Sequence, residues 1–147
     1  MSDSLALLIS DSARLLRRRF DARARSLGVS RAQWQVMFAL SRLEGINQAG
    51  LAEELDVETI TVGRMVDRLA EADLVERRPD PQDRRVWRLH LRPRAHPILD
   101  ALRVVGADVM SVTLAGLSDA EQAQLAALLL RVRGNLTQSP PQQSAAE

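Results

Sequence analysis

The chain is 147 residues long and carries a formal net charge of +1, with 46% hydrophobic and only 3% aromatic residues. That length accommodates one domain, with or without an appended dimerisation element, and the scarcity of aromatic rings argues against a single-strand nucleic-acid binder that stacks bases. Because the chain contains no cysteine, structural disulfides, thiolate metal sites and a cysteine redox switch are excluded.

The first predicted helix covers residues 4–27, where apolar residues recur at helical spacing and neither proline nor glycine intervenes before Gly28. Its apolar residues are Leu5, Leu8, Leu15, Leu16, Phe20 and Leu27. Its polar side carries Arg14, Arg17, Arg18, Arg19, Arg23 and Arg25. A solvated basic face is the simplest interpretation of these arginines, and a dimer contact or an anion-binding role for one or two of them is the alternative.

A second helix is predicted over residues 31–43. Gly28 ends the preceding helix, and the hydroxyl of Ser30 can accept from the free amides of the new first turn. The apolar residues on or near one face are most simply core residues: Trp34, Met37, Phe38 and Leu40. Ile46 is then expected in a short strand, and Asn47 suits the N-cap of the helix that follows.

Residues 48–72 predict a helix-turn-helix. A compact helix over 48–55 is separated by two residues from a helix over 58–72, and so short a turn makes the second helix cross the first at a steep angle. The second helix turns Val62, Met65, Val66 and Leu69 inward, and it turns Ile60, Thr61, Arg64, Asp67, Arg68 and Glu71 outward. Small groups followed by arginines suit a helix inserted in a major groove, where side chains meet base edges and phosphates. The segment therefore indicates a DNA-binding protein.

A two-stranded ribbon follows, with strands predicted over 74–78 and 86–91 and a turn-rich loop between them. The loop presents two acids and two arginines: Asp80, Asp83, Arg84 and Arg85. An exposed charged hairpin that resists edge-to-edge aggregation would have this composition. So would a wing that places arginine in the negative potential of the minor groove, with a carboxylate holding a guanidinium in one orientation.

Two further helices are predicted near the C-terminus. The first begins at Arg94 or Ala95, tolerates Pro97 in its first turn and carries an apolar stripe towards Gly116. The second starts at the capping box Ser118-Asp119-Ala120-Glu121 and carries Leu125, Leu128, Leu129, Val132 and Leu136. With the N-terminal helix, they hold more apolar surface than one small module can bury, which predicts an obligate dimer. The polar segment 138–147 is predicted to be a disordered tail.

Metal-dependent, enzymatic and membrane functions have little support in the sequence. The two histidines, His90 and His96, would need carboxylates at no recognisable spacing to complete a metal site, so neither metal nor cofactor is expected. No nucleophile–base pair or glycine-rich phosphate loop indicates an enzyme. No apolar run approaches the roughly 20 residues that span a bilayer, and the N-terminus lacks the basic segment of a secretory signal. A cytoplasmic protein is therefore expected.

Three segments together resemble the MarR family of bacterial transcription regulators: LAEEL at 51–55, TVGRMVDRL at 61–69 and LVERRPDPQDRR at 74–85. The most specific part is the wing, where the family's spacing of two aspartates and an arginine falls on Asp80, Asp83 and Arg85. The resemblance covers about residues 6–136. It departs from the family pattern at Pro93, where the family usually has a helix-capping threonine, and at Ile60, where some relatives have proline.

This resemblance implies a mainly α fold of the α+β type with four parts. A winged helix-turn-helix DNA-binding domain would occupy residues 30–92, between an N-terminal dimerisation helix over 1–29 and C-terminal dimerisation helices over 93–137. The tail over 138–147 would complete the chain. Two winged lobes of a homodimer would then bind a pseudo-palindromic duplex site.

The resemblance also implies the residues that act. Arg85 would enter the minor groove with Asp83 as its orienting partner. The residues assigned to DNA are Asn47, Gln48, Thr59, Ile60, Thr61, Arg64, Arg68, Asp83, Arg84 and Arg85. Many family members release DNA when a small aromatic carboxylate binds, and the positions that resemble that pocket are Arg14, Ser30, Trp34, Phe38 and Met65. A repressor of its own and neighbouring genes is favoured over an activator. The alternatives are a ligand-independent regulator and a winged-helix module that binds protein.

Overall fold

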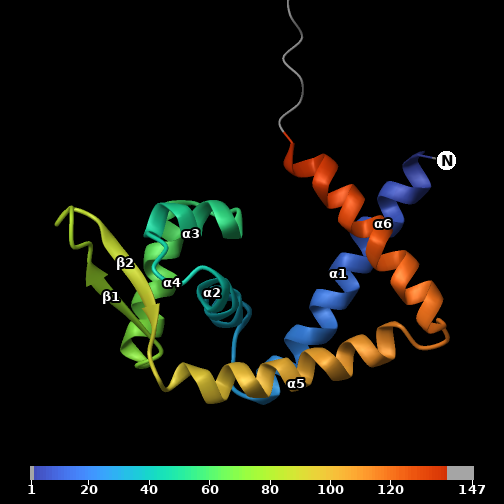
Figure 1. Cartoon of the computed structure of the whole chain (residues 1–147). Coiled ribbons are helices and arrows are strands. Elements are labelled where there is room, and N and C mark those ends of the chain that lie inside the picture. The colour runs from blue at the N-terminus through green and yellow to red at the C-terminus, as the bar shows by residue number, and fades with distance from the viewer. Residues whose placement is uncertain (1, 139–147) are drawn as a thin grey trace, which may run out of the picture. The chain divides into compact units, whose positions relative to one another are not determined.

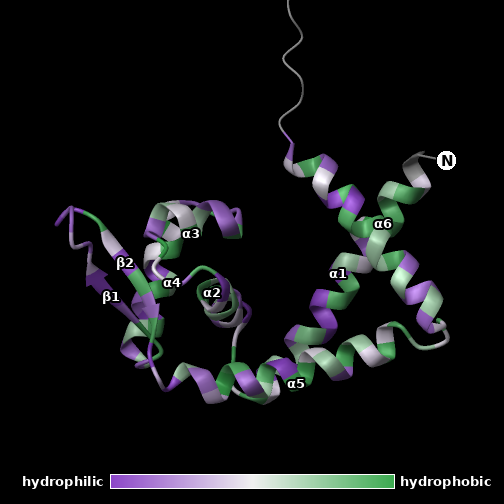
Figure 2. Ribbon diagram, in the orientation of Figure 1, coloured by the Kyte–Doolittle hydropathy of each residue, from purple (hydrophilic) through white to green (hydrophobic). Residues whose placement is uncertain are grey.

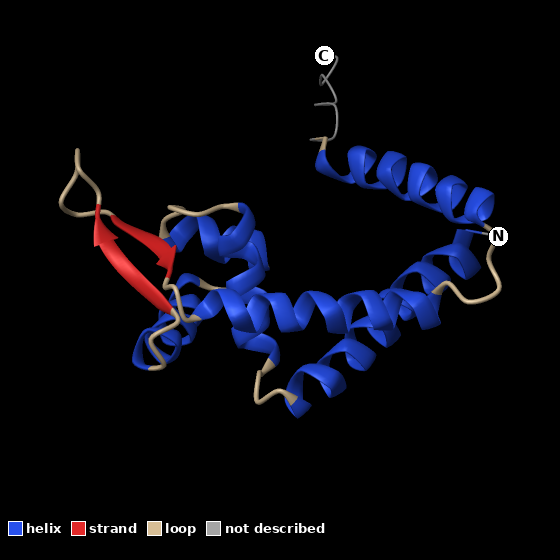
Figure 3. Ribbon diagram, turned by 60° about the horizontal axis from the view of Figure 1, so that its bottom comes forward, coloured by secondary structure: helices blue, strands red, loops and turns tan. Residues whose placement is uncertain are grey.

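The computed structural model describes residues 2–138 and is mainly helical, with one two-stranded antiparallel sheet in the part described (Figures 1 and 3). The elements are α1 (Ser2–Ser26), α2 (Arg31–Arg42), α3 (Gln48–Leu55), α4 (Thr59–Glu71), β1 (Val75–Pro79), β2 (Trp87–Leu91), α5 (Ala95–Thr113) and α6 (Asp119–Thr137). They confirm the predicted fold class and the predicted order of elements. The chain divides into two compact units, Met1–Met110 and Ser111–Glu147.

Three helix starts follow from local side-chain caps that the sequence predicts. The hydroxyl of Ser30 accepts from the Gln33 amide, and the Gln33 side chain accepts from the Ser30 amide in return. Asn47 accepts from the Gly50 amide at 2.8 Å and so begins α3. A second reciprocal capping box joins Ser118 and Glu121 at the start of α6. Each cap satisfies amide groups that have no partner within the first turn of a helix.

The core of the first unit is built around α2, which packs against α3, α4 and β2. Val36, Met37 and Leu40 of α2 are fully buried. Trp34 and Phe38, predicted as core residues, are only partly buried at the edge of this core. The reason is that the two side chains lie on the side of α2 that faces α1. They therefore point away from the centre of the winged lobe, which consists of α2, α3, α4, β1 and β2.

The sheet is an antiparallel hairpin whose register runs from Val75 opposite Leu91 to Pro79 opposite Trp87. Leu89 and Leu91 are buried on one face, as their alternation predicts. The segment before α3 adds a second, short pairing to β2, because the Leu89 amide donates to the Ile46 carbonyl at 3.0 Å and the Gly45 amide donates to the Leu89 carbonyl at 2.9 Å. The short strand expected at Ile46 is reduced to a single backbone bridge between Asn47 and Arg88, and the Ile46 carbonyl accepts one of the hydrogen bonds beside it. This bridge ties the hairpin to the helix-turn-helix.

The C-terminal helices differ in how much apolar surface they bury. α5 begins without a side-chain cap from Pro93; its first amides instead donate to the backbone carbonyls of Arg92 and Pro93. It ends at Thr113, before Gly116, towards which the apolar stripe was predicted to run, and Val112 near its end is 58% exposed. α6 contains no buried residue. The predicted tail over 138–147 lies outside the described residues except for Gln138. Among residues 2–138, every helix falls short of the length or the apolar character that a membrane span requires.

A buried carboxylate fastens α1 to α2. Asp21 is 5% exposed, and its two oxygens accept from the Trp34 indole at 2.8 Å and from Arg31 Nε at 2.7 Å. Burial by itself raises the pKa of Asp21, but the hydrogen bonds from Arg31 and Trp34 outweigh it, and the pKa lies below its ordinary value. A carboxylate in this state stabilises the fold above its unfolded pKa of about 3.9, and the contribution is lost as the pH falls through the folded pKa.

We expect Asp21→Asn to lower the free energy of unfolding by about 2 kcal/mol at pH 7, because an amide NH₂ would face the Arg31 guanidinium and leave a buried group unsatisfied. Urea titrations at pH 7 and at pH 3 measure the difference between the variant and the parent, which should shrink at the lower pH. Asp100→Asn is the matched control, since Asp100 is 72% exposed and its ion pair is with Arg103 in the same helix. An equal difference at both pH values would contradict the assignment.

Candidate nucleic-acid interface

Helix α4 has one fully buried face and one exposed face. Val62, Val66 and Leu69 have no exposed area, and they anchor α4 against the core of the winged lobe. The opposite face presents Ile60, which is 65% exposed, together with Thr61, Arg64 and Arg68. An α-helix with this division can be rigidly held along its length while its outer side chains remain available to a duplex.

The joint between α3 and α4 is held by side chains that the sequence assigns to DNA. Asn47 is occupied by its cap on Gly50, and the amide of Gln48 donates to the Thr59 carbonyl at 3.3 Å. The Gln48 amide also packs on Gly63, where an added Cβ would lie 3.0 Å from Nε2. The Gln48 contacts join the start of α3 to α4, whereas the Asn47 cap lies within the first turn of α3. A DNA contact by Asn47 or Gln48 remains a prediction.

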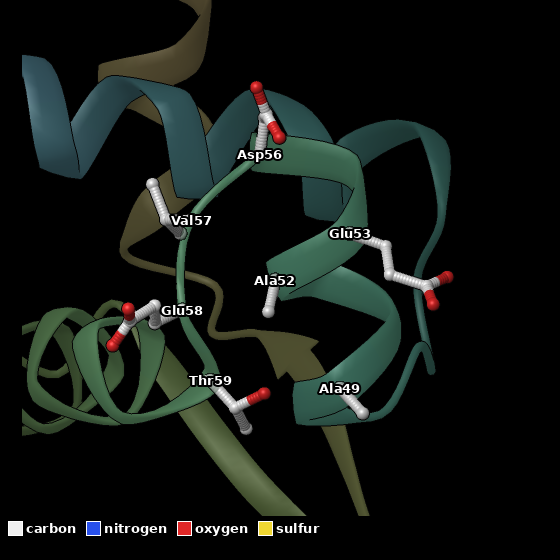
Figure 4. Close-up of a pocket in the computed structure, with 7 residues that line it drawn as sticks. All are labelled: Ala49, Ala52, Glu53, Asp56, Val57, Glu58 and Thr59. Atoms are coloured by element: carbon white, nitrogen blue, oxygen red, sulfur yellow. The ribbon is translucent and has the colours of Figure 1, made fainter.

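A hollow of about 680 Å³ lies at the turn between these helices and is lined by Ala49, Ala52, Glu53, Asp56, Val57, Glu58 and Thr59 (Figure 4). The carboxylates of Glu53, Asp56 and Glu58 point away from one another in Figure 4. Among the described residues, no group of three acids or histidines is arranged to hold a metal ion. The negative charge here disfavours a phosphate, so a duplex would meet the interface on the arginine side of α4.

An arginine of the hairpin holds α4 in place. Arg77 Nη2 donates to Asp67 at 2.7 Å and to the Gly63 carbonyl at 3.3 Å, and both acceptors lie on α4. Asp67, one of the predicted outward residues, is therefore paired. Arg64 and Arg68 are exposed and have no ion-pair or hydrogen-bond partner among residues 2–138, so their guanidinium groups remain available to an external anion.

The wing loop is held by its own carboxylates. Asp83 accepts from the backbone amide of Arg85 at 3.0 Å. Asp83 thus contacts the backbone of Arg85, whereas the expected partner was the guanidinium. The side chains of Arg84 and Arg85 are exposed, and neither guanidinium has a partner in the described part of the chain. Two free arginines at the tip of a hairpin fit the size and the negative potential of a minor groove.

The other wing acid, Asp80, has a structural partner that the sequence pattern did not identify. Its Oδ2 accepts from Arg88 Nε at 2.6 Å, and Arg88 Nη1 donates to the Gly45 carbonyl at 3.2 Å. Hydrogen bonds from the Gln82 amide, from Arg88 and from the Asp83 amide lower the pKa of Asp80. Alternation along β2 places Arg88 on the face opposite Leu89, but it does not reveal which acid Arg88 meets.

The residues assigned to an aromatic ligand fall into two different cavities. Trp34 and Phe38 line a largely apolar cavity of about 380 Å³ with Phe20, Gly106 and Val109, and the one charged residue in its lining is Arg17. The Phe20 and Trp34 rings meet edge to face with centroids 5.0 Å apart. Flat apolar walls and one guanidinium could hold a small aromatic acid.

Ser30 and Met65 lie in the second cavity, of about 360 Å³, together with Gln33, Thr61, Arg64 and Arg68. Arg14 lines neither cavity and pairs with Asp11 at 3.1 Å within α1. Spacing along the chain did not separate these two groups. Arg17 belongs to the basic face for which an anion-binding role was one alternative, but it was not among the residues assigned to the ligand, and its one distinguishing signal was its position one helical turn before Phe20.

Comparison with known proteins adds independent evidence. The MarR family model matches residues 29–87, which contain α2, the helix-turn-helix and the wing. An uncharacterized HTH-type transcriptional regulator, YybA of Bacillus subtilis (strain 168), is 28% identical over 112 residues, which are 76% of this chain and 75% of that protein.

Solved structures match over a longer part of the chain. The crystal structure of transcriptional regulator PA3341 is 32% identical, with a TM-score of 0.79, and the alignment covers 90% of this chain and 97% of that one. A mutant of MarR from E. coli complexed with operator DNA is 28% identical, with a TM-score of 0.76 and coverage of 88% and 93%. Both likenesses include helices on either side of the winged lobe, because they extend well beyond residues 29–87.

Proposed function

The chain belongs to the MarR family of transcription regulators, and from this premise we propose that it binds duplex DNA as a homodimer, with α4 in the major groove and the wing arginines in the minor groove. As a member of this family it is a DNA-binding regulator and not an enzyme. The finer proposal is that it represses its own and neighbouring genes from a pseudo-palindromic site and that it acts in the cytoplasm.

One observation carries the DNA-binding proposal. Four arginines on the exposed side of the winged lobe, Arg64 and Arg68 of α4 and Arg84 and Arg85 of the wing, have no acid partner among the described residues. The neighbouring arginines Arg77 and Arg88 are paired within the protein. Free, forked guanidinium groups on an insertable helix and on a ribbon tip match the phosphates and base edges of a duplex better than the surface of a protein partner.

Unpartnered apolar side chains support the homodimer. In α1 these are Leu5, Leu7, Leu8, Ile9 and Leu15; in α6 they are Leu125, Leu128, Leu129, Leu130, Val132 and Leu136. In Figure 2 both helices include segments coloured as hydrophobic. A helix that exposes so many large apolar side chains is typical of a subunit interface. The two α4 helices of a dimer would need to stand about 34 Å apart to enter successive major grooves.

An aromatic carboxylate is the proposed effector, and it binds in the cavity beside Trp34 and Phe38. The cavity volume of about 380 Å³ suits a small ring, and Arg17 supplies the cation for its carboxylate. Ser30, Met65 and Arg14 are not part of this cavity. The ligand-independent regulator is the competing account.

We expect Arg85→Ala to weaken duplex binding about tenfold, because loss of an arginine that reads a base costs on the order of 1–3 kcal/mol. Fluorescence anisotropy with the DNA upstream of the protein's own gene, at about 50 and 200 mM salt, measures both the loss and the salt dependence expected from counterion release. Arg103→Ala, which removes an arginine paired with Asp100 in α5, is the control and should bind like the parent. Salt-independent binding by the parent, or an unaltered Arg85→Ala variant, would reject the wing assignment.

For the dimer, sedimentation velocity should give twice the chain mass of 16.3 kDa. Leu128→Glu should shift the protein towards the monomer and lower its DNA affinity, because a carboxylate in an apolar interface is costly to desolvate. Ala127→Glu adds the same charge to α6 on the side turned away from Leu125, Leu129 and Leu136, and it serves as the control. A parent protein that sediments as a monomer at micromolar concentration would exclude the dimer.

For the effector, salicylate should raise the melting temperature of the parent, because a ligand that binds only the folded state stabilises it. Arg17→Ala should abolish this shift, whereas Arg14→Ala should preserve it. If Arg14→Ala abolishes the shift and Arg17→Ala preserves it, then Arg14 is the residue that binds the carboxylate. Absence of heat in calorimetric titrations with a panel of aromatic acids would favour the ligand-independent regulator.

A further inference from the structure

We propose that Asp80 and Arg88 are positioning residues that set the wing arginines relative to the helix-turn-helix without touching DNA themselves. The inference rests on the proposed function, because it concerns how Arg85 reaches the minor groove. It assigns the two wing acids different tasks: Asp83 holds the backbone at Arg85, and Asp80 holds the loop to the rest of the winged lobe.

Asp80 is unusually enclosed for a residue in a hairpin loop. Its side chain is 11% exposed, whereas Asp83, Arg84 and Arg85 are all exposed. One oxygen accepts from the backbone amides of Gln82 at 2.8 Å and Asp83 at 3.1 Å, and the other accepts from Arg88 at 2.6 Å. If Asp80 served only to repel neighbouring hairpins, its carboxylate would be exposed to solvent. It is instead enclosed and accepts three hydrogen bonds.

Consecutive hydrogen bonds lead from Asp80 through Asp83 to Arg85. Asp80 accepts from the Asp83 amide, and Asp83 in turn accepts from the Arg85 amide at 3.0 Å. The loop is closed by the Asp80 amide, which donates to the Val86 carbonyl at 2.9 Å. The backbone conformation at Arg85 therefore depends on a series of hydrogen bonds, the first of which the Asp80 carboxylate accepts.

Arg88 extends this arrangement out of the wing. While its Nε binds Asp80, its Nη1 donates to the Gly45 carbonyl at 3.2 Å, 43 residues earlier in the chain. Gly45 lies two residues before Asn47, the N-cap of α3, and Asn47 itself forms a bridge with Arg88 in the backbone. One guanidinium thus joins the wing loop to the start of the helix-turn-helix. A lysine could not make both contacts, because it lacks the planar fork.

Loss of the Asp80 charge and loss of its positioning role should change DNA affinity in opposite directions, which makes the inference testable. Replacing Asp80 by asparagine removes a negative charge close to the DNA, so electrostatics alone would strengthen binding to the phosphates. The same change presents an NH₂ group to Arg88 and disrupts the positioning bonds. If positioning dominates, the neutral variant binds DNA more weakly.

The first measurement compares Asp80→Asn and Arg88→Lys with the parent by fluorescence anisotropy on the same duplex. Each variant should weaken binding about tenfold, because charge-assisted hydrogen bonds of this kind are lost and tenfold corresponds to about 1.4 kcal/mol. Asp100→Asn is the matched control for charge removal and should not weaken binding. Thermal unfolding verifies that every variant is folded at the assay temperature. Binding by Asp80→Asn that equals or exceeds that of the parent would overturn the inference.

The second measurement is a double-mutant cycle with a variant that lacks both wing arginines, Arg84→Ala/Arg85→Ala. In that background Asp80→Asn should no longer weaken binding, because the groups it positions are absent. A loss of equal size in both backgrounds would mean that Asp80 acts through general stability, and it would overturn the inference while leaving the wing assignment intact. If removal of both arginines leaves binding unaltered, the wing does not read DNA, and the positioning role and the wing assignment both fail.

Discussion

The burial of one face of α4 is the constraint on which the rest of the winged lobe depends. A helix of 13 residues cannot be both firmly packed and open to a duplex unless its two faces are chemically distinct. Val62, Val66 and Leu69 meet this requirement on the inside. Because they determine the rotation of the helix about its axis, they also determine that Arg64 and Arg68 face outward. The packing of the core and the composition of the exposed face of α4 are therefore consequences of one arrangement.

Paired arginines connect the hairpin to this helix and to its neighbours. Arg77 reaches two acceptors on α4, Arg88 joins the wing loop to the segment before α3, and Arg92 reaches Glu76 and Asp73. Hydrogen bonds from Arg78 and Arg92 lower the pKa of Glu76, which keeps that acid ionised as an acceptor. A forked guanidinium can serve two acceptors at once, whereas an ammonium cannot present the same planar pair of donors. In a chain without lysine, arginine thus fills two roles: paired, it supports the wing; unpaired, it is available to DNA.

The contact between α1 and α2 places a polar support behind an apolar cavity. Trp34 presents its ring to Phe20 and Phe38, and its indole nitrogen is held by the buried Asp21. Asp21 also accepts from Arg31 in the first turn of α2. The same carboxylate therefore orients a wall of the cavity and fastens the start of the helix around which the winged lobe is packed. Any molecule that moved the Trp34 ring would therefore disturb the hydrogen bond between its indole nitrogen and Asp21.

The sequence by itself determined the features that depend on neighbours a few residues apart. The caps at Ser30, Asn47 and Ser118 join positions three residues apart, and helical spacing predicts the buried and exposed faces of α4, so both could be derived from residue order. The turn-rich loop and its two arginines indicated a wing from residue order, and the family resemblance then singled out Arg85 within it. Only the tertiary structure decided which groups meet across long separations. It paired Arg88 with Asp80 and Gly45, divided Trp34 and Phe38 from Ser30 and Met65, and placed Arg17, not Arg14, beside the aromatic rings. The physical reason is that periodicity specifies the face on which a side chain lies, whereas its partner depends on how separate elements pack together.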